Sequence, residues 1–364
     1  LSGDYVPTAG ETFLIAMPEN TSTPGGRAFR GLPDGATLEF NGGLLQITYP
    51  TRFAFGGGIF FTLTTIQGAN QGTWTGAVDS DWYNPNNWAS GTVPTEGDDV
   101  LIEAGTNPAV LPSGTVNVAS LALLNGGDFT VAEGATLLVN AGTAGLVAQS
   151  GQLTVNGILF VNQQANGEPM LGVPTTIGST GRLIYQGISS DVIVTENLTC
   201  NGLLQLNDGA GLSLEGDGGL SVGTTGDCQI NGATGTGLLH NGAGVVIDGK
   251  LTILNSGGDG IRAINDNGLV FRPTGEVTLR NNAGHGIACE DRASYPINVR
   301  GVLNISGSGL NAVDEGIFLP RTGGTFRCGG TIDTRWQSEE GYRLAVGDSL
   351  GCLSAVNGIN AENA

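Results

Sequence analysis

ILNSGGDGI (residues 253–261) and LRNNAGHGI (residues 279–287) are two versions of one pattern in the second half of the chain. Each runs from apolar residues through small and amide residues to a closing Gly and an Ile. Two more versions are INGATGTGL (230–238) and ISGSGLNAVDEGI (305–317), so the closing glycines of the four are Gly237, Gly260, Gly286 and Gly316. A repeat of about 20–30 residues with short strands and glycine turns is typical of a β-solenoid.

Leu251, Val277 and Leu303 recur at strictly equal intervals, so we expect them to stack in one buried column. Asn residues at the turns can adopt left-handed conformations and can stack into amide ladders between coils. The sequence therefore predicts an all-β fold, with a right-handed parallel β-helix over residues 108–335.

The chain is strongly acidic, with 33 acidic residues against 14 basic ones and a formal net charge of −19 in 364 residues. Such a surface repels nucleic-acid phosphates, so we expect no nucleic-acid partner. It could attract divalent cations, or simply keep a β-rich surface soluble. The longest uncharged apolar run, FAFGGGIFFTLTTI (53–66), is too short for a helix that spans a bilayer.

Three further segments differ from the repeats. Residues 1–70 alternate strand-like runs with Pro-Gly turns and predict a small β-rich module. Residues 71–107 are rich in Trp, and Trp74, Trp82 and Trp88 predict a cap over the exposed core at the solenoid end. Residues 336–364 break the rhythm, and Trp336 predicts a C-terminal cap or interface there.

Two of these segments resemble secreted bacterial giant repeat proteins and autotransporter-like adhesins with a pectin-lyase-like β-solenoid. The stretches that carry the resemblance are GDYVPTAGETF (3–13), FRGLPDGATLEFNG (29–42), ITYP (47–50) and GTWTGAVDSDWYNPNNWASGTVPTEGDDVLI (72–102). The resemblance implies a secreted protein at the cell surface. Because Leu1 falls inside such a module, we expect the chain to be a mature form or a fragment of a longer precursor.

The cysteines predict two cross-links between neighbouring coils. Cys200 and Cys228 are separated along the chain by close to one coil, and so are Cys328 and Cys352. Stacked positions lie about 4.8 Å apart, which is within disulfide range if the side chains converge. The alternative is that they are buried thiols. Cys289 is left without a partner in this pairing, and it would be either a free thiol or part of an intermolecular disulfide.

Acidic side chains gather in the Trp-rich segment and could hold calcium. Asp79 and Asp81 lie close to Asn84, and Asp98 and Asp99 end the same segment. Carboxylate and amide oxygens are the ligands that Ca²⁺ prefers. The alternative is that these side chains cap turns, and no cofactor is required for the fold.

Catalysis is the rival interpretation, since Gly284-His285-Gly286 is similar to one motif of galacturonan hydrolases with a parallel β-helix. The other motifs of those enzymes are missing. A cleft that joins His285 to Glu290 and Asp314 would favour an enzyme, whereas glycan binding through Trp82, Tyr83 and Trp88 would favour an adhesin.

The prediction for function is a non-enzymatic, extracellular structural or adhesive protein. Stacked coils would form a stiff spacer or the subunit of an extracellular filament that assembles through its ends. Its partners would be neighbouring copies, other repeats of the same polypeptide, or a glycan. The alternatives are a polysaccharide lyase or hydrolase and a carbohydrate-binding β-helix.

Overall fold

A computed structural model describes most of the chain from residue 71 onward and four strands before it. The described residues are 12–17, 37–40, 43–48, 59–67, 71–140, 145–162, 169–187, 190–264, 268–289, 296–306, 317–319, 325–328, 331–335 and 344–346.

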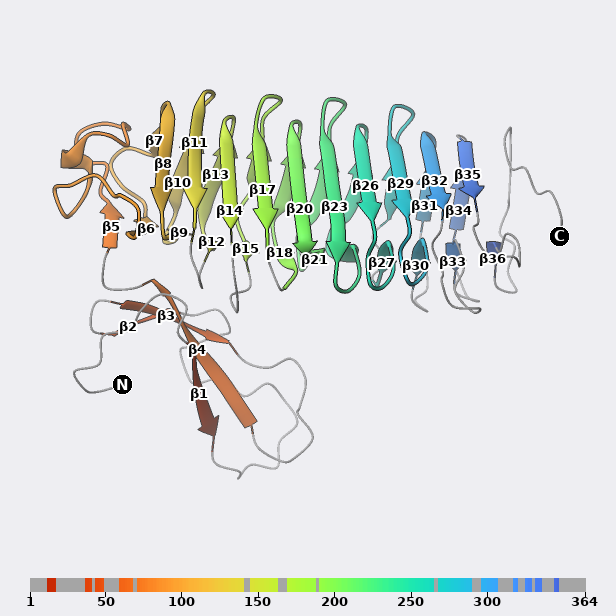
Figure 1. The fold of residues 1–364 in the computed structure, drawn as a ribbon, viewed down its shortest axis with the longest axis horizontal. Coiled ribbons are helices and arrows are strands. Elements are labelled where there is room, and N and C mark those ends of the chain that lie inside the picture. The colour runs from red at the N-terminus through yellow and green to blue at the C-terminus, as the bar shows by residue number, and fades with distance from the viewer. Residues whose placement is uncertain are drawn as a thin grey trace.

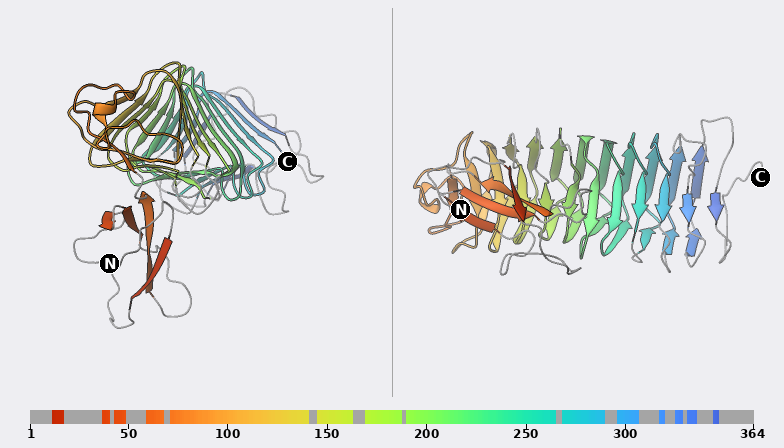
Figure 2. Two further views of the ribbon diagram at one scale, coloured as in Figure 1. Left: turned by 60° about the vertical axis from the view of Figure 1, so that its left-hand side comes forward. Right: turned by 90° about the horizontal axis from the view of Figure 1, so that it is seen from below.

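Three long parallel sheets form a rod, and successive coils contribute one strand to each sheet (Figures 1 and 2). Sheet 1 holds β7 (Ala109–Leu111), β10 (Gly127–Val131), β13 (Gly151–Val155), β16 (Thr175–Ile177), β19 (Asn197–Cys200), β22 (Gly219–Val222), β25 (Gly244–Ile247), β28 (Leu269–Phe271), β31 (Pro296–Val299) and β34 (Thr325–Cys328). Sheet 2 holds β8 (Gly114–Val118), β11 (Ala135–Val139), β14 (Ile158–Asn162), β17 (Arg182–Gln186), β20 (Leu203–Gly209), β23 (Asp227–Ala233), β26 (Lys250–Leu254), β29 (Glu276–Arg280), β32 (Val302–Ser306) and β35 (Thr331–Arg335). Sheet 3 holds β5 (Gln71–Trp74), β6 (Asp99–Ile102), β9 (Ser120–Leu123), β12 (Leu146–Ala148), β15 (Met170–Leu171), β18 (Val192–Val194), β21 (Leu212–Glu215), β24 (Leu238–Asn241), β27 (Ile261–Ala263), β30 (Ile287–Cys289), β33 (Ile317–Leu319) and β36 (Leu344–Val346).

A separate antiparallel sheet of four strands precedes the rod, in the order β1-β4-β3-β2. Its strands are β1 (Thr12–Met17), β2 (Thr37–Phe40), β3 (Gly43–Thr48) and β4 (Ile59–Gln67). β4 contacts β6 and β9, and Figure 1 shows the small sheet beside the first coils. The one helical element among the described residues is the short 3₁₀ helix η1 (Pro85–Asn87). No described helix is long and apolar enough to cross a membrane.

Alternating strand residues build the core. In sheet 2, Leu251 pairs with Val277 and Val277 pairs with Leu303, and all three side chains are fully buried. Their intervening neighbours, such as Thr252 and Thr278, face outward, as the period of two in a strand requires. The predicted β-solenoid and its buried column are confirmed.

The parallel stacking begins before the predicted start at residue 108. β5 and β6, which belong to the Trp-rich segment, already pair in register with each other and with β9 in sheet 3. The irregular part is confined to the loop between these two strands. The first coil therefore lies inside the segment that the sequence predicts to be only a cap.

Glycine residues make the corners between sheet 1 and sheet 2. From β13 to β32 each of these corners contains glycine, and two-residue corners such as Asn201-Gly202 and Asp248-Gly249 alternate with four-residue corners such as 223–226. The corner amides bond from coil to coil, as in Leu203 N to Gly181 O at 2.9 Å. A Cβ atom on Gly202 would lie 2.2 Å from the carbonyl oxygen of Gly181, so only glycine fits this close approach.

Gly202→Ala is therefore expected to destabilise the chain by about 1–3 kcal/mol, because backbone rather than a flexible side chain would have to move. Gly235→Ala is the matched control, since a Cβ atom on Gly235 meets nothing within 4 Å. Urea unfolding of both variants checks the prediction. Equal stability of the two variants would contradict the role of the corner glycines.

Asparagine residues make the corners between sheet 2 and sheet 3, within the repeated pattern. Asn255 and Asn281 adopt positive φ angles of 56° and 54°. The side-chain amide of Asn255 donates to Asn231 Oδ1 at 2.9 Å, and that of Asn281 donates to Asn255 Oδ1 at 3.3 Å. Asn tolerates the left-handed conformation and also supplies the amide that links the coils.

Candidate functional site

Three tryptophans, Trp74, Trp82 and Trp88, form a cluster that closes the N-terminal end of the solenoid core. This cluster is named the Trp block. The rings of Trp74 and Trp88 meet edge to face at 5.0 Å, and those of Trp82 and Trp88 do so at 4.7 Å. Trp82 also lies 5.6 Å from the ring of Phe129 in β10. All three are at most 3% exposed. The rings thus extend the apolar core beyond the first strands of sheets 1 and 2.

The loop that carries the Trp block also binds the edges of two sheets. Thr75 N donates to Asn87 O at 2.8 Å and Ala89 N donates to Thr73 O at 2.9 Å, which covers the edge of β5. Trp82 N donates to Val110 O at 3.0 Å, which covers the edge of β7. Exposed strand edges are templates for pairing with other chains, and these bonds remove two of them.

Asn87 organises this loop from a fully buried position. Its Oδ1 accepts from the backbone N–H of Val78 at 2.9 Å and of Asp79 at 3.1 Å. Its Nδ2 donates to Asp79 Oδ1 at 2.6 Å and to Asp81 O at 2.9 Å. The sequence pattern alone does not single out this residue. Its position directly before Trp88, in an aromatic motif expected to be buried, is the sequence feature that could have identified it as a buried polar residue.

Of the four aspartates predicted to hold calcium, Asp79 and Asp81 share one hydrogen-bonded turn, whereas Asp98 and Asp99 bond to other partners. Asp79 accepts from Asp81 N at 2.9 Å and from the Asn84 amide at 2.9 Å. Asp81 accepts from Tyr83 N at 3.0 Å, Asp98 accepts from Thr95 N at 2.7 Å, and Asp99 accepts from the hydroxyl of Ser120. Within the described ranges, no three His, Cys, Asp or Glu side chains group as metal ligands. The geometry matches the turn-capping alternative.

Hydrogen bonds from Asn84, Asn87 and the Asp81 backbone hold the pKa of Asp79 below its ordinary value of 3.8. A lowered carboxyl pKa contributes stability above the ordinary pKa, and this contribution disappears as the pH falls through the lowered value. The destabilisation caused by Asp79→Ala is therefore expected to be larger at pH 6 than near pH 2. Unfolding curves of both proteins at the two pH values test this, and an equal difference at both would contradict it.

The aromatic residues of the Trp block are not available to stack on a glycan. Trp82 is fully buried and Trp88 is 3% exposed, so only Tyr83 of the proposed trio, at 41%, reaches solvent. The Tyr83 hydroxyl donates to Ser113 O at 2.6 Å. This corrects the adhesin alternative that placed glycan binding on Trp82 and Trp88. Trp336 lies outside the described residues.

Cys200 and Cys228 are free, buried thiols in this structure, so the predicted disulfide is not formed. The expectation that the two residues stack in one column is wrong. Cys200 pairs with Val222 in sheet 1, whereas Cys228 pairs with Leu204 in sheet 2. Their separation along the chain is one coil plus the corner. Cys352 and the side chains of Cys289 and Cys328 lie outside the described residues.

His285 lies in the corner between sheets 2 and 3. Its backbone N–H donates to Asp259 Oδ1 of the previous coil at 2.8 Å. Asp259 thereby links two corners of the repeated pattern. Glu290 and Asp314, the other members of the cleft that would favour an enzyme, lie outside the described residues.

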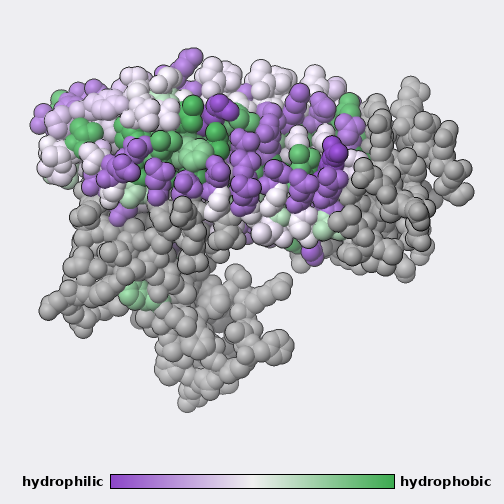
Figure 3. Space-filling model, viewed as in Figure 1, coloured by the Kyte–Doolittle hydropathy of each residue, from purple (hydrophilic) through white to green (hydrophobic). Residues whose placement is uncertain are grey.

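The outer face of sheet 2 carries a block of half-buried apolar side chains over its first coils. Leu138, Phe160 and Ile184 form one outward column, and Ile158 and Leu203 belong to the column beside it. Figure 3 shows hydrophobic side chains gathered on this part of the face, bordered by hydrophilic ones.

The same face is nearly neutral in a chain of net charge −19. From β8 to β32, the strands of sheet 2 contain three basic residues and three acidic ones, so their charges cancel. These residues are Arg182, Asp208, Asp227, Lys250, Glu276 and Arg280. The excess negative charge therefore lies elsewhere on the molecule.

Comparison with known proteins gives one match. A family model described as a domain of unknown function (DUF8693) matches residues 73–168. These residues comprise the loop of the Trp block together with the first coils, so the matched unit crosses the predicted boundary at residue 108. No curated protein and no solved structure matches the chain.

Proposed function

We propose that the chain is a non-enzymatic structural rod of an extracellular surface protein, which holds neighbouring segments at a fixed distance. The observation that carries the proposal is the unbroken in-register pairing of three parallel sheets around one apolar core. Such a stack resists bending because each coil is bonded to the next through strands on three sides. The role requires no cofactor.

The polar residues of the described loops support a structural role. Asp79, Asp81, Asp98 and Asp259 each accept hydrogen bonds from backbone amides. Asn87 forms four hydrogen bonds within its own loop. These five side chains are thus committed to holding turns in place.

The proposal favours a spacer over a filament that grows through the N-terminal end of the rod. The loop of the Trp block already bonds to β5 and β7, so strand addition at these edges would have to displace it. The expected partners are adjacent segments of the same polypeptide.

Surface labelling tests the proposed location. Antibodies raised against the purified chain are expected to label intact source cells, and external protease should remove the label. Labelling that appears only after the cells are made permeable would refute an extracellular role.

Carbohydrate binding is a second candidate, and the outer face of sheet 2 favours it. The Phe160 ring lies there between Leu138 and Ile184, and Gln205 continues the same column. Apolar and amide groups on a sheet face without net charge suit a neutral polysaccharide chain, whose sugar rings have apolar faces and hydroxyl edges.

Phe160→Ser is expected to weaken binding to an insoluble neutral polysaccharide by at least about tenfold, because the ring supplies the main apolar contact. Thr278→Ser, on the polar half of the same face, should leave binding unchanged. Co-sedimentation with cellulose, chitin and β-glucan measures the effect. Absence of binding by the unmodified chain to all three would remove this candidate.

A further inference from the structure

Cys200 and Cys228 lie on either side of one corner of the rod, in neighbouring coils. Cys200 is the last residue of β19 and precedes the short corner Asn201-Gly202. Cys228 is the second residue of β23 and follows the longer corner 223–226 of the next coil. The two cysteines therefore approach the same corner from opposite sheets.

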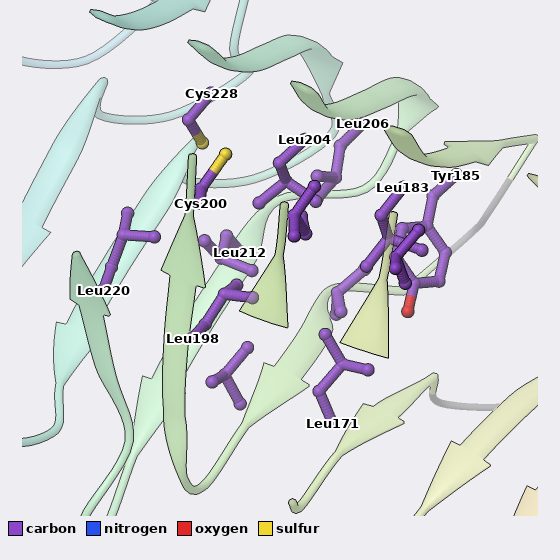
Figure 4. Close-up of a cluster of buried hydrophobic side chains, with 14 of the residues drawn as sticks. Leu171, Leu183, Tyr185, Leu198, Cys200, Leu204, Leu206, Leu212, Leu220 and Cys228 are labelled. Atoms are coloured by element: carbon purple, nitrogen blue, oxygen red, sulfur yellow. The ribbon is translucent and has the colours of Figure 1, made fainter. Parts of the chain in front are cut away.

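Two observations place their side chains together. Cys200 Sγ lies within hydrogen-bond distance of two carbonyl oxygens, 3.3 Å from Gly202 O and 3.8 Å from Asp227 O. The second carbonyl belongs to the peptide bond that joins Asp227 to Cys228. Figure 4 shows the sulfur atoms of Cys200 and Cys228 pointing toward one another inside the core. Both side chains are fully buried.

We propose that Cys200 and Cys228 form a disulfide across this corner when the chain folds in an oxidising compartment. Residues stacked in one column point the same way, whereas residues on adjoining sheets point inward from two directions and converge at the corner. The proposal rests on the extracellular location inferred above, since that setting allows a disulfide to persist.

Thiol–disulfide exchange with an external small-molecule or protein disulfide supplies the oxidation. The Cys200 thiolate attacks one sulfur of the external disulfide, forms a mixed disulfide and releases one external thiolate. The Cys228 thiolate then attacks the Cys200 sulfur and releases the second. The two cysteines are oxidised, the external disulfide is reduced to two thiols, and these take up the two protons that the cysteines lose.

The exchange has to precede the packing of the core. In the folded chain, burial raises the pKa of Cys200 to about 11, and burial together with the neighbouring Cys200 raises that of Cys228. At neutral pH only about one Cys200 in ten thousand would then be a thiolate. The folded thiol form is also closed to an external disulfide, so it should persist once it has formed.

Refolding in two redox conditions tests the proposal. A variant with Cys289, Cys328 and Cys352 changed to Ser leaves only the proposed pair. It is unfolded in denaturant and refolded in a mixture of oxidised and reduced glutathione, or with reductant alone. The glutathione mixture is also added to protein already folded in the reduced form. Peptide mapping without reduction then identifies the cross-link.

The Cys200–Cys228 peptide is expected after oxidative refolding and not after treatment of the folded thiol form. The cross-linked protein should melt on the order of 5 °C higher than the reduced protein. Adding Cys228→Ser to the variant should remove both effects. Thiols that remain free after oxidative refolding, with native circular dichroism, would overturn the proposal. Rapid cross-linking of the folded thiol form would contradict the inference that oxidation has to precede packing of the core.

If the triple variant fails to refold, the same map is made on chain exported to a bacterial periplasm and on chain from the cytoplasm. A cross-link in the periplasmic protein alone supports the proposal, and its absence from both overturns it. Because the map uses isolated protein, its result is independent of the surface labelling that tests the proposed function.

Discussion

Trp82→Ala is expected to lower the free energy of unfolding by about 3–5 kcal/mol. The Trp82 side chain is fully buried between Trp88 and Phe129, and its removal would leave a cavity where the Trp block meets the first coils. Trp88 Nε1 also donates to Trp82 O at 2.8 Å, so a shift of the backbone would strain a second ring. Loss of this one side chain should loosen the whole block.

Val78→Ala is the matched control, because Val78 belongs to the same loop and is 58% exposed. Its stability should stay within about 0.5 kcal/mol of the unmodified chain. Urea unfolding followed by far-ultraviolet circular dichroism measures both variants without depending on Trp fluorescence. Similar stabilities of the two variants would show that the Trp block does not close the core.

Val277→Asp should have a larger effect, since it places an unpaired carboxylate in the buried column between Leu251 and Leu303. Burial of such a charge without a partner costs more than about 4 kcal/mol. Because each coil contacts only its neighbours, the damage should be concentrated in the coils on either side. The Trp block, several coils away, should keep its structure.

Thr278→Asp adds the same charge one residue along, on the outer side of β29, and should be tolerated. Limited proteolysis with mass mapping is expected to cut the Val277→Asp chain near residues 251–303 and to spare residues 71–140. Equal resistance of both variants would contradict the assigned inward face. Uniform cleavage throughout the Val277→Asp chain would instead contradict the independence of distant coils.

The sequence predicts the fold well where the pattern is local and periodic. The spacing of Leu251, Val277 and Leu303 identifies the coil, because a residue that returns to the same column must repeat at the coil length. The Asn residues at the turns of the repeated pattern are likewise predictable, because Asn tolerates the left-handed conformation that these turns require. The predicted boundary at residue 108 is wrong because one irregular loop, rich in Trp, separates two regular strands.

The candidate site is harder to predict, because it depends on the hydrogen bonds that each side chain forms in the fold rather than on its residue type. Asp79 and Asp98 suit calcium by composition, yet each already accepts bonds from nearby amides. The separation of Cys200 and Cys228 along the chain indicates that they lie in neighbouring coils. It does not show that they belong to different sheets, since two-residue and four-residue corners alternate. The burial of Asn87 depends on tertiary packing around the Trp block.

The central claim is that the coils stack in register into one stiff rod, and a distance between two spin labels tests it most directly. Thr130 in β10 and Val270 in β28 face outward in the same column of sheet 1. In a variant whose native cysteines are replaced, labels at these two positions are separated by six coil steps of about 4.8 Å, or roughly 29 Å. We predict a single narrow distance distribution near this value in pulsed dipolar spectroscopy. A broad or multiple distribution, or a mean far from it, would contradict the account.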